Sequence, residues 1–190
     1  MYRFMSPKNK IYGRCSRAVT KIFTVKEARV IQLETKFRLV GVGGTFDQLH
    51  KGHMALLIKA FEVGETVWIG LVTDDFAKKL QKNHEVAPYN ERMAELTYYL
   101  KKMSPDGRFK ITPLDDAYGP AATDKELEAI VVSKETEPVA HQINEVRRHV
   151  GLAPLHVIVI DMIPAENHIP ISTTRIRYGE IDRDGRLLRR

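Results

Sequence analysis

The chain has 190 residues, 43% of them apolar, and carries a formal net charge of +6 with a pI near 9.4. This length and apolar content suit one globular domain with a buried core, which excludes a disordered chain. Its single cysteine excludes an internal disulfide framework, and no apolar run approaches the roughly 20 residues that span a bilayer, so we expect a soluble, cytoplasmic protein.

The positive charge is concentrated in residues 1–36, which hold nine Lys or Arg against two acids, whereas the rest of the chain holds 21 basic and 22 acidic residues. A nucleic-acid-binding domain carries its positive charge on the folded body. We therefore expect neither nucleic acid nor a membrane as a partner. Residues 1–36 are predicted to form a basic N-terminal extension, flexible or loosely docked; a targeting peptide, a wrongly assigned start or a binding arm are the alternatives.

Residues 37–190 are predicted to form one domain that begins with a strand and a helix. FRLVGVGG (37–44) is a short apolar run that ends in glycines. HMALLIKAFEVG (53–64) then places Met54, Leu57, Ile58 and Phe61 on one helical face, which we expect to be buried, before Gly64 ends the helix.

Strand and helix patterns alternate along the remainder of the chain. The predicted strands are TVWIGLV (66–72), FKITPL (109–114), EAIVVS (128–133) and LHVIVID (155–161). The predicted helices are PYNERMAELTYYLKKM (88–103), EPVAHQINEVRRHVG (137–151) and a short one from STTRIRYG (172–179), with a lysine-bearing loop or short helix in 73–87. This order predicts an α/β fold with a Rossmann-like, doubly wound, five-stranded parallel sheet, which binds ligands at the carboxyl ends of its strands.

The turn between the first strand and the first helix is predicted to bind phosphate. Gly43 and Gly44 allow backbone amides to approach an anion, and the helix that begins near Gly52 adds unpaired amides and a partial positive charge. His50 and His53 lie one helical turn apart, so both rings can face the same pocket and donate hydrogen bonds to a pentacoordinate phosphorus. A zinc pair would typically have i, i+4 spacing with a Glu between, so we expect no metal ligand here.

The string GGTFDQLHKGHMALL, with His50-Lys51-Gly52-His53 at its centre, resembles the signature of the HxGH nucleotidyltransferase superfamily. Cytidylyltransferases, FAD synthetases and phosphopantetheine adenylyltransferases share this form. The segments VWIGLVTDDFAKK, EAIVVSKETEP, INEVRRHVGLAPLHVIVIDMI and ISTTRIRYGEI make the chain similar, over about residues 38–186, to phosphopantetheine adenylyltransferases of the archaeal and eukaryotic type. Another HxGH nucleotidyltransferase and a nucleotide-sensing binding module are the alternatives.

The resemblance implies an HxGH nucleotidyltransferase fold and transfer of AMP from ATP to 4′-phosphopantetheine, giving dephospho-coenzyme A and pyrophosphate. It implies in-line attack on the α-phosphorus without a covalent enzyme intermediate. Magnesium is expected as a cofactor, held mainly through the ATP phosphates. The sequence leaves the oligomeric state open and is compatible with a monomer.

The motif matches also assign candidate site residues. The catalytic candidates are His50, His53 and Lys78, with sequence spacing favouring Lys78 over Lys79. The candidates for substrate binding are Gly43, Gly44, Thr45, Phe46, Asp47 and Lys78, and those for ATP binding are His50, His53, Ser172, Thr173 and Thr174. A hydroxyl of Thr45 or of the 172–174 cluster can donate to a phosphate oxygen, whereas Asp47 is expected to brace the loop and not to act as a base.

Other polar residues receive no catalytic role from the sequence. Glu91 and Arg92 are explained as a surface pair, and neither Arg175 nor Arg177 is favoured as a ligand contact. Residues 133–136, SKET, replace the arginine-rich segment of the bacterial branch, so the ATP contacts at this strand end stay open. The five histidines that lack companion spacing are interpreted as structural or surface residues: His84, His141, His149, His156 and His168.

Overall fold

The computed structural model describes residues 37–80 and 84–188. The basic extension predicted for residues 1–36 lies outside the described residues. None of the helices in the described part of the chain is long and apolar enough to cross a membrane.

Strands and helices alternate along the chain as predicted. The strands are β1 (Phe37–Gly44), β2 (Gly64–Val72), β3 (Phe109–Leu114), β4 (Ala129–Ser133) and β5 (His156–Ile160). The helices are α2 (Lys51–Val63), α3 (Asp74–Lys79), α4 (Tyr89–Met103), α5 (Glu137–His149) and α6 (Thr173–Arg177), with a 3-10 turn η1 (Gly119–Ala122) that the sequence did not signal.

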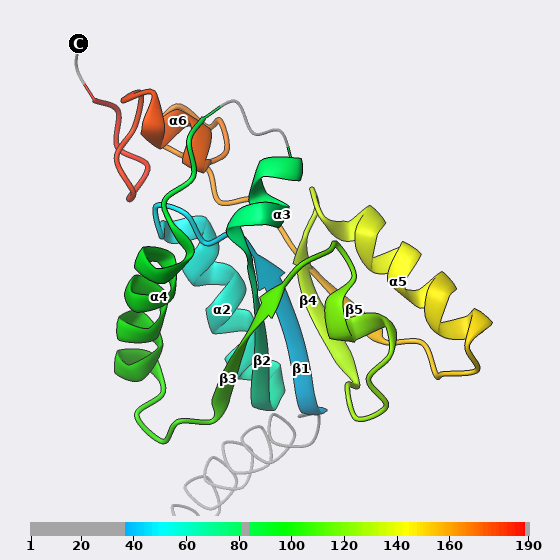
Figure 1. The fold of residues 1–190 in the computed structure, drawn as a ribbon. Coiled ribbons are helices and arrows are strands. Elements are labelled where there is room, and N and C mark those ends of the chain that lie inside the picture. Colours follow the sequence, from blue (N-terminus) through cyan, green and yellow to red (C-terminus); the bar gives the residue numbers. More distant parts are fainter. Residues whose placement is uncertain (1–36, 81–83, 189–190) are drawn as a thin grey trace, which may run out of the picture. The chain divides into compact units, whose positions relative to one another are not determined.

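The five strands form one sheet in the order β3-β2-β1-β4-β5, and each adjacent pair is parallel. The strand order reverses between β1 and β4, as in a doubly wound sheet, which confirms the predicted fold class. In Figure 1, helices α3 and α6 lie beyond the end of the sheet at which β1 and β2 finish. The carboxyl ends of the strands therefore lie below these two short helices.

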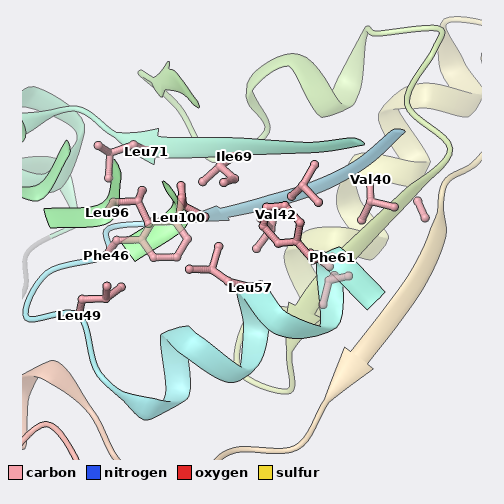
Figure 2. Packing of buried hydrophobic residues seen from close by; sticks show 14 residues of the cluster. Val40, Val42, Phe46, Leu49, Leu57, Phe61, Ile69, Leu71, Leu96 and Leu100 are labelled. Atoms are coloured by element: carbon pink, nitrogen blue, oxygen red, sulfur yellow. The ribbon is translucent and has the colours of Figure 1, made fainter. Parts of the chain in front are cut away.

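Each face of the sheet is covered by its own hydrophobic cluster. Leu57 and Phe61 of α2 and Leu96 and Leu100 of α4 pack against alternate residues of the strands (Figure 2), while Ala140 and Ile143 of α5 pack on Leu39 and Ile130 on the other face. The expectation that Ile58 is buried is wrong, because its side chain is 44% exposed and Ala60 takes a buried position in α2 instead.

The strands β1 and β4 separate toward their carboxyl ends. The register of β1 with β2 continues to Gly44, but its register with β4 stops at the pair of Gly41 and Ile130. Strand β4 stays paired with β5 as far as Ser133 and Ile160. The two halves of the sheet therefore diverge at the point where the strand order reverses, which is where doubly wound folds bind their ligands.

Candidate functional site

A cavity of about 690 Å³ opens where β1 and β4 separate. Its walls come from the end of β1, the start of α2, the ends of β4 and β5, and residues 171–174 before and within α6. A volume of this order is typical of a site for a ligand of nucleotide size. The predicted site residues that line it are Gly43, Gly44, Thr45, His50, His53, Ser172, Thr173 and Thr174.

The two histidines of the motif lie side by side in the cavity wall. Their ring centroids are 3.8 Å apart and their planes differ by 25°, so the rings are stacked. His50 is the N-cap of α2, and its Nδ1 accepts a hydrogen bond from the backbone N–H of Gly52 at 3.1 Å. Because Nδ1 accepts, the neutral ring of His50 carries its proton on Nε2. Both rings therefore lie at the same cavity, as the spacing of the two residues predicts.

Gly52 allows the first histidine to take this position. A Cβ at residue 52 would lie 2.9 Å from Cε1 and 3.1 Å from Nδ1 of His50, closer than real side chains approach. The ring of His50 is only 6% exposed, so it has little room to yield. The glycine between the histidines is therefore required by the close approach of the His50 ring to its backbone.

The expectation of an anion site built from unpaired helix amides is partly wrong. The N–H of Lys51 donates to the carbonyl of Arg183 at 3.1 Å, and that of Gly52 donates to His50. These two amides are satisfied within the protein, so the sequence-based argument overestimated what the end of α2 offers. An anion at this wall could still interact with the glycine turn, the two imidazoles and the partial positive charge of the helix.

The loop between β1 and α2 has an unusual backbone. Phe46 and Gln48 adopt positive φ angles of 48° and 49°, in the left-handed region that residues other than glycine rarely occupy. Each such residue costs about 1–3 kcal/mol and persists only where neighbours hold it. The side chain of Phe46 is 1% exposed and belongs to the same cluster as Leu57 (Figure 2), so it packs in the core and does not line the cavity, contrary to its assignment as a substrate contact.

Asp47, between these two residues, points away from the cavity into a polar cluster. Its side chain is fully buried and receives two hydrogen bonds from Arg177, at 2.8 and 3.2 Å, and one from the N–H of Ala87 at 3.2 Å. The hydrogen bond to Asp47 is the main reason that the pKa of Arg177 lies above its usual value. These contacts brace the loop, and Asp47 is not among the residues that line the cavity, so its assignment to substrate binding stays a prediction.

The surface interpretation of Arg92 is wrong. This residue is 1% exposed, and its guanidinium donates to the carbonyls of Ala87, Thr45 and Val72 and to Oδ1 of Asp74, at 2.7 to 2.9 Å. It therefore ties the end of β2 and the start of α3 to the loop between β1 and α2. A signal was present in the sequence, because residues 92, 96 and 100 follow the i, i+4, i+8 spacing of the buried face of α4.

The hydroxyls of the second predicted anion cradle are engaged within the protein. Ser172 is the N-cap of α6 and accepts from the N–H of Arg175, while the hydroxyl of Thr173 donates to the carbonyl of Asp47 at 2.9 Å. Thr174 Oγ1 lies 3.2 Å from Nδ1 of His84. All three residues line the cavity as predicted, but their side chains also fix α6 against the first loop.

His84 is a cavity residue that the sequence gave no means of finding. Its Nε2 lies 3.7 Å from Oδ2 of Asp47, and its side chain is 6% exposed. It joins Thr174 in the wall of the cavity through a contact between segments 90 residues apart. Sequence spacing alone cannot reveal such a contact.

The predicted lysine lies outside the cavity wall. Lys78 is on the exposed side of α3, with its Nζ 3.5 Å from Asp75, and its side chain is 78% exposed. Lys79 is exposed as well. The turn that replaces the bacterial arginines is held by Ser133 and Thr136, whose hydroxyls lie 3.2 Å apart, and both residues line the cavity.

Comparison with known proteins points to one family. Residues 42–179 match the model of the cytidylyltransferase-like family. The chain is 50% identical over 158 residues to the phosphopantetheine adenylyltransferase of Methanothermobacter thermautotrophicus, a match that covers 83% of this chain and 94% of that protein. It is 46% identical over 151 residues to the enzyme of the same name from Methanosarcina mazei, covering 78% of this chain and 96% of that one.

A similar fold occurs in a crystal structure of a protein of unknown function from Archaeoglobus fulgidus. That structure superposes with a TM-score of 0.59 at 28% identity and covers 64% of this chain and 88% of the other. The two chains share the fold over this part.

Proposed function

We propose that this chain, which belongs to the cytidylyltransferase-like family and within it to the phosphopantetheine adenylyltransferases, transfers AMP from ATP to 4′-phosphopantetheine. The products of this reaction are dephospho-coenzyme A and pyrophosphate. The observation that carries the proposal is the stacked pair His50 and His53 in the wall of a cavity at the reversal of strand order. The chain aligns over more than nine-tenths of both relatives named above, and the match to the family model, residues 42–179, includes every cavity-lining residue except Gly41.

The proposed chemistry is a direct displacement at phosphorus. A phosphate oxygen of phosphopantetheine attacks the α-phosphorus of ATP, a new P–O–P bond forms, and the bond to the β-phosphate breaks as pyrophosphate leaves. Such a transfer needs positioning and charge stabilisation more than covalent help from the protein. His50, through its Nε2–H, and His53 supply the donors as charge builds on the non-bridging oxygens.

We assign the two phosphate-bearing ligands to the two sides of this histidine pair. Gly43, Gly44 and Thr45 would bind the phosphate of the acceptor and the α-phosphate of ATP, and residues 172–174 would face the β- and γ-phosphates. The residues described along the cavity wall include no Lys or Arg. The Lys78 side chain is 78% exposed and has one long ion pair, with Asp75, so we propose that it turns toward the phosphates when they are bound.

Magnesium is proposed to enter with ATP. In residues 37–80 and 84–188 no group of three or more His, Cys, Asp or Glu is arranged to hold a metal ion. The donor set therefore fits an ion held by phosphate oxygens and water, as Mg²⁺ commonly is. Such an ion neutralises the polyphosphate charge that the leaving group carries.

The acceptor assay tests the proposal. The protein is incubated with ATP or CTP together with phosphopantetheine or glycerol phosphate, and pyrophosphate release is followed. Release with ATP and phosphopantetheine alone is the expected result. Release only with CTP and glycerol phosphate would identify a cytidylyltransferase, and nucleotide binding without turnover would favour a sensing module.

We further propose that residues 37–190 are the catalytic domain, that nucleic acid is not a partner, and that the reaction takes place in the cytoplasm. All the cavity residues lie in this range, and the sequence carries one cysteine. A chain without residues 1–36 should keep its turnover. Loss of turnover together with a salt-sensitive affinity for nucleic acid would contradict this assignment.

A further inference from the structure

Two arginines from the C-terminal part of the chain bind consecutive residues of the strained first loop. Arg177 donates from Nη2 and Nε to the two carboxylate oxygens of Asp47, at 2.8 and 3.2 Å. Arg183 donates from Nη2 and Nε to Oε1 of Gln48, at 3.0 and 3.2 Å. These partners lie 130 and 135 residues apart in the sequence, so the contacts exist only in the folded domain.

The same C-terminal segment also binds the backbone of the loop and of the helix after it. The hydroxyl of Thr173 donates to the carbonyl of Asp47, and the carbonyl of Arg183 accepts from the N–H of Lys51. The Nζ of Lys51 lies 3.5 Å from Asp184. Figure 1 shows this segment, in orange and red, beside the start of α2. From Asp47 to Lys51 the loop is therefore fastened through both side chains and backbone.

The loop needs such support because of its backbone. Phe46 and Gln48 flank Asp47 in the left-handed region, and His50 follows two residues later as the helix cap. Backbone conformations of this kind persist only where surrounding contacts fix them, and they gather at functional sites. A loop that relaxed toward ordinary φ angles would shift the backbone of His50, break the cap contact of its ring with Gly52 and so move the ring away from His53.

We propose that the contacts of Thr173, Arg177, Arg183 and Asp184 with residues 47–51, here called the clasp, hold the loop 45–50 in the conformation that the paired histidines require, with Arg177 and Arg183 as positioning residues. The inference rests on the proposed function. Neither arginine lines the cavity. The Arg177 side chain acts on the loop through the fully buried carboxylate of Asp47, and the Arg183 side chain acts on it through Oε1 of Gln48 while also pairing with Glu95 of α4.

Arg175 provides a matched control within the same helix. Its guanidinium donates to the carbonyls of Ile169 and Pro170 and to Asn167, and it pairs with Glu180. None of these partners belongs to the loop 45–50. A general loss of packing in α6 should therefore appear in Arg175→Met as strongly as in the clasp variants.

The first measurement is the separation of kcat from KM. Arg177→Met is expected to lower kcat by about ten- to a hundredfold with little change in the KM for ATP, because displacement of catalytic groups by about 1 Å has costs of this size. Arg183→Met should lower kcat several-fold, and Arg175→Met should keep it close to wild type. In Arg177→Ala, added guanidinium should restore part of kcat, since the Arg177 side chain is 27% exposed and small cations can enter.

The second measurement, amide hydrogen exchange over residues 45–52, needs no turnover. Faster exchange in this peptide in both clasp variants, and not in Arg175→Met, supports the clasp. Exchange and kcat that match Arg175→Met in both variants overturn it. Arg183→Met decides the matter if Arg177→Met does not fold, because the Arg183 side chain is 46% exposed. If the wild-type protein does not adenylylate phosphopantetheine, the proposed function is wrong. The hydrogen-exchange result would still test the clasp in that case.

Discussion

Two buried arginines, Arg92 and Arg147, stand on opposite sides of the cavity and differ in what they fasten. Both are at most 2% exposed, and each donates to three backbone carbonyls. Arg92 donates to the carbonyl of Thr45, in the loop between β1 and α2, and is paired with the carboxylate of Asp74. The carbonyls that accept from Arg147 belong to Ala121, Asp124 and Ala153, around η1 and the end of α5.

The electrostatics of the two arginines differ as well. Arg147 has no ion pair within the described part of the chain, and burial lowers the pKa of its guanidinium. It fixes the shape of the wall formed by α5 and η1, while Arg92 fixes the wall that carries Thr45 and the histidines. We therefore expect Arg147 to maintain the shape of the cavity for substrate binding and Arg92 to maintain the positions of the groups that take part in the reaction. Substitution of each arginine tests this difference.

The largest effect is expected from Arg92→Met. This change leaves three buried carbonyls without their arginine donor and also removes the guanidinium from Asp74, whose side chain is 48% exposed, so it should cost about 3 kcal/mol of folding stability. Arg147→Met removes only hydrogen bonds to carbonyls and should cost about 2–3 kcal/mol. Urea unfolding followed by circular dichroism measures both losses.

The activity of these two variants tests the assignment of walls. Among molecules that remain folded, Arg92→Met should lose most of its kcat, whereas Arg147→Met should retain kcat and change the KM of one substrate. Equal kcat values in the two variants would show that the walls do not divide shape from chemistry.

The second prediction concerns His53, which lies in the cavity wall on the side of Arg92. His53→Ala should lower kcat by about two to three orders of magnitude with a modest change in ATP affinity, since one donor to developing charge is worth about 3 kcal/mol. Val139→Ala, on the Arg147 side of the same cavity, is the matched control and should act on KM. Unchanged turnover in His53→Ala, measured by pyrophosphate release, would remove the catalytic role of this ring.

Much of the fold and part of the site could be predicted because their signals are local. Strand and helix patterns, the glycine turn and the spacing of His50 and His53 all depend on residues near one another in the sequence. The positions of Asp47 and His84 depend on partners 90 to 130 residues away, which no periodicity encodes. Arg92 lay on the periodic buried face of α4, but its charge favoured a surface interpretation; burial became favourable only because carbonyls and Asp74 surround it.

The third prediction sharpens the role of close packing at the histidine pair. Gly52→Ala should lower kcat by about tenfold or more, because the new Cβ would displace the His50 ring. Its effect on folding stability should be small, since alanine is a better helix former than glycine. The corresponding change on the other side of the cavity, Ala140→Gly in α5, should instead lower stability and spare kcat. A Gly52→Ala variant with wild-type kcat would show that the ring can yield.

The smallest expected effect is a loss of folding stability at low pH that comes from Asp74, the partner of Arg92. Burial by itself would raise the pKa of Asp74, but a hydrogen bond from the backbone of Tyr89 and the guanidinium of Arg92 outweigh it, so its pKa lies below the usual 3.8. A carboxyl group with a lowered pKa in the folded state adds stability above the unfolded pKa, and this stability is lost as the pH falls through the folded pKa. Because the side chain is 48% exposed, the contribution should be less than about 1 kcal/mol.

The acceptors of Arg147 are all carbonyls, so no such loss is expected on its side. Urea unfolding of wild type and Asp74→Asn between pH 6 and pH 3 should give a stability difference that is constant at the upper end of this range and shrinks as the pH falls below the usual carboxyl pKa of 3.8 toward the lower folded pKa of Asp74. The protection of the Tyr89 amide against hydrogen exchange, relative to its intrinsic rate at each pH, should fall over the same range in the wild type, while the protection of amides beside Arg147 should not change. If the stability difference between wild type and Asp74→Asn persisted at low pH, the contribution of Asp74 would come from its packing and hydrogen bonds and not from its negative charge.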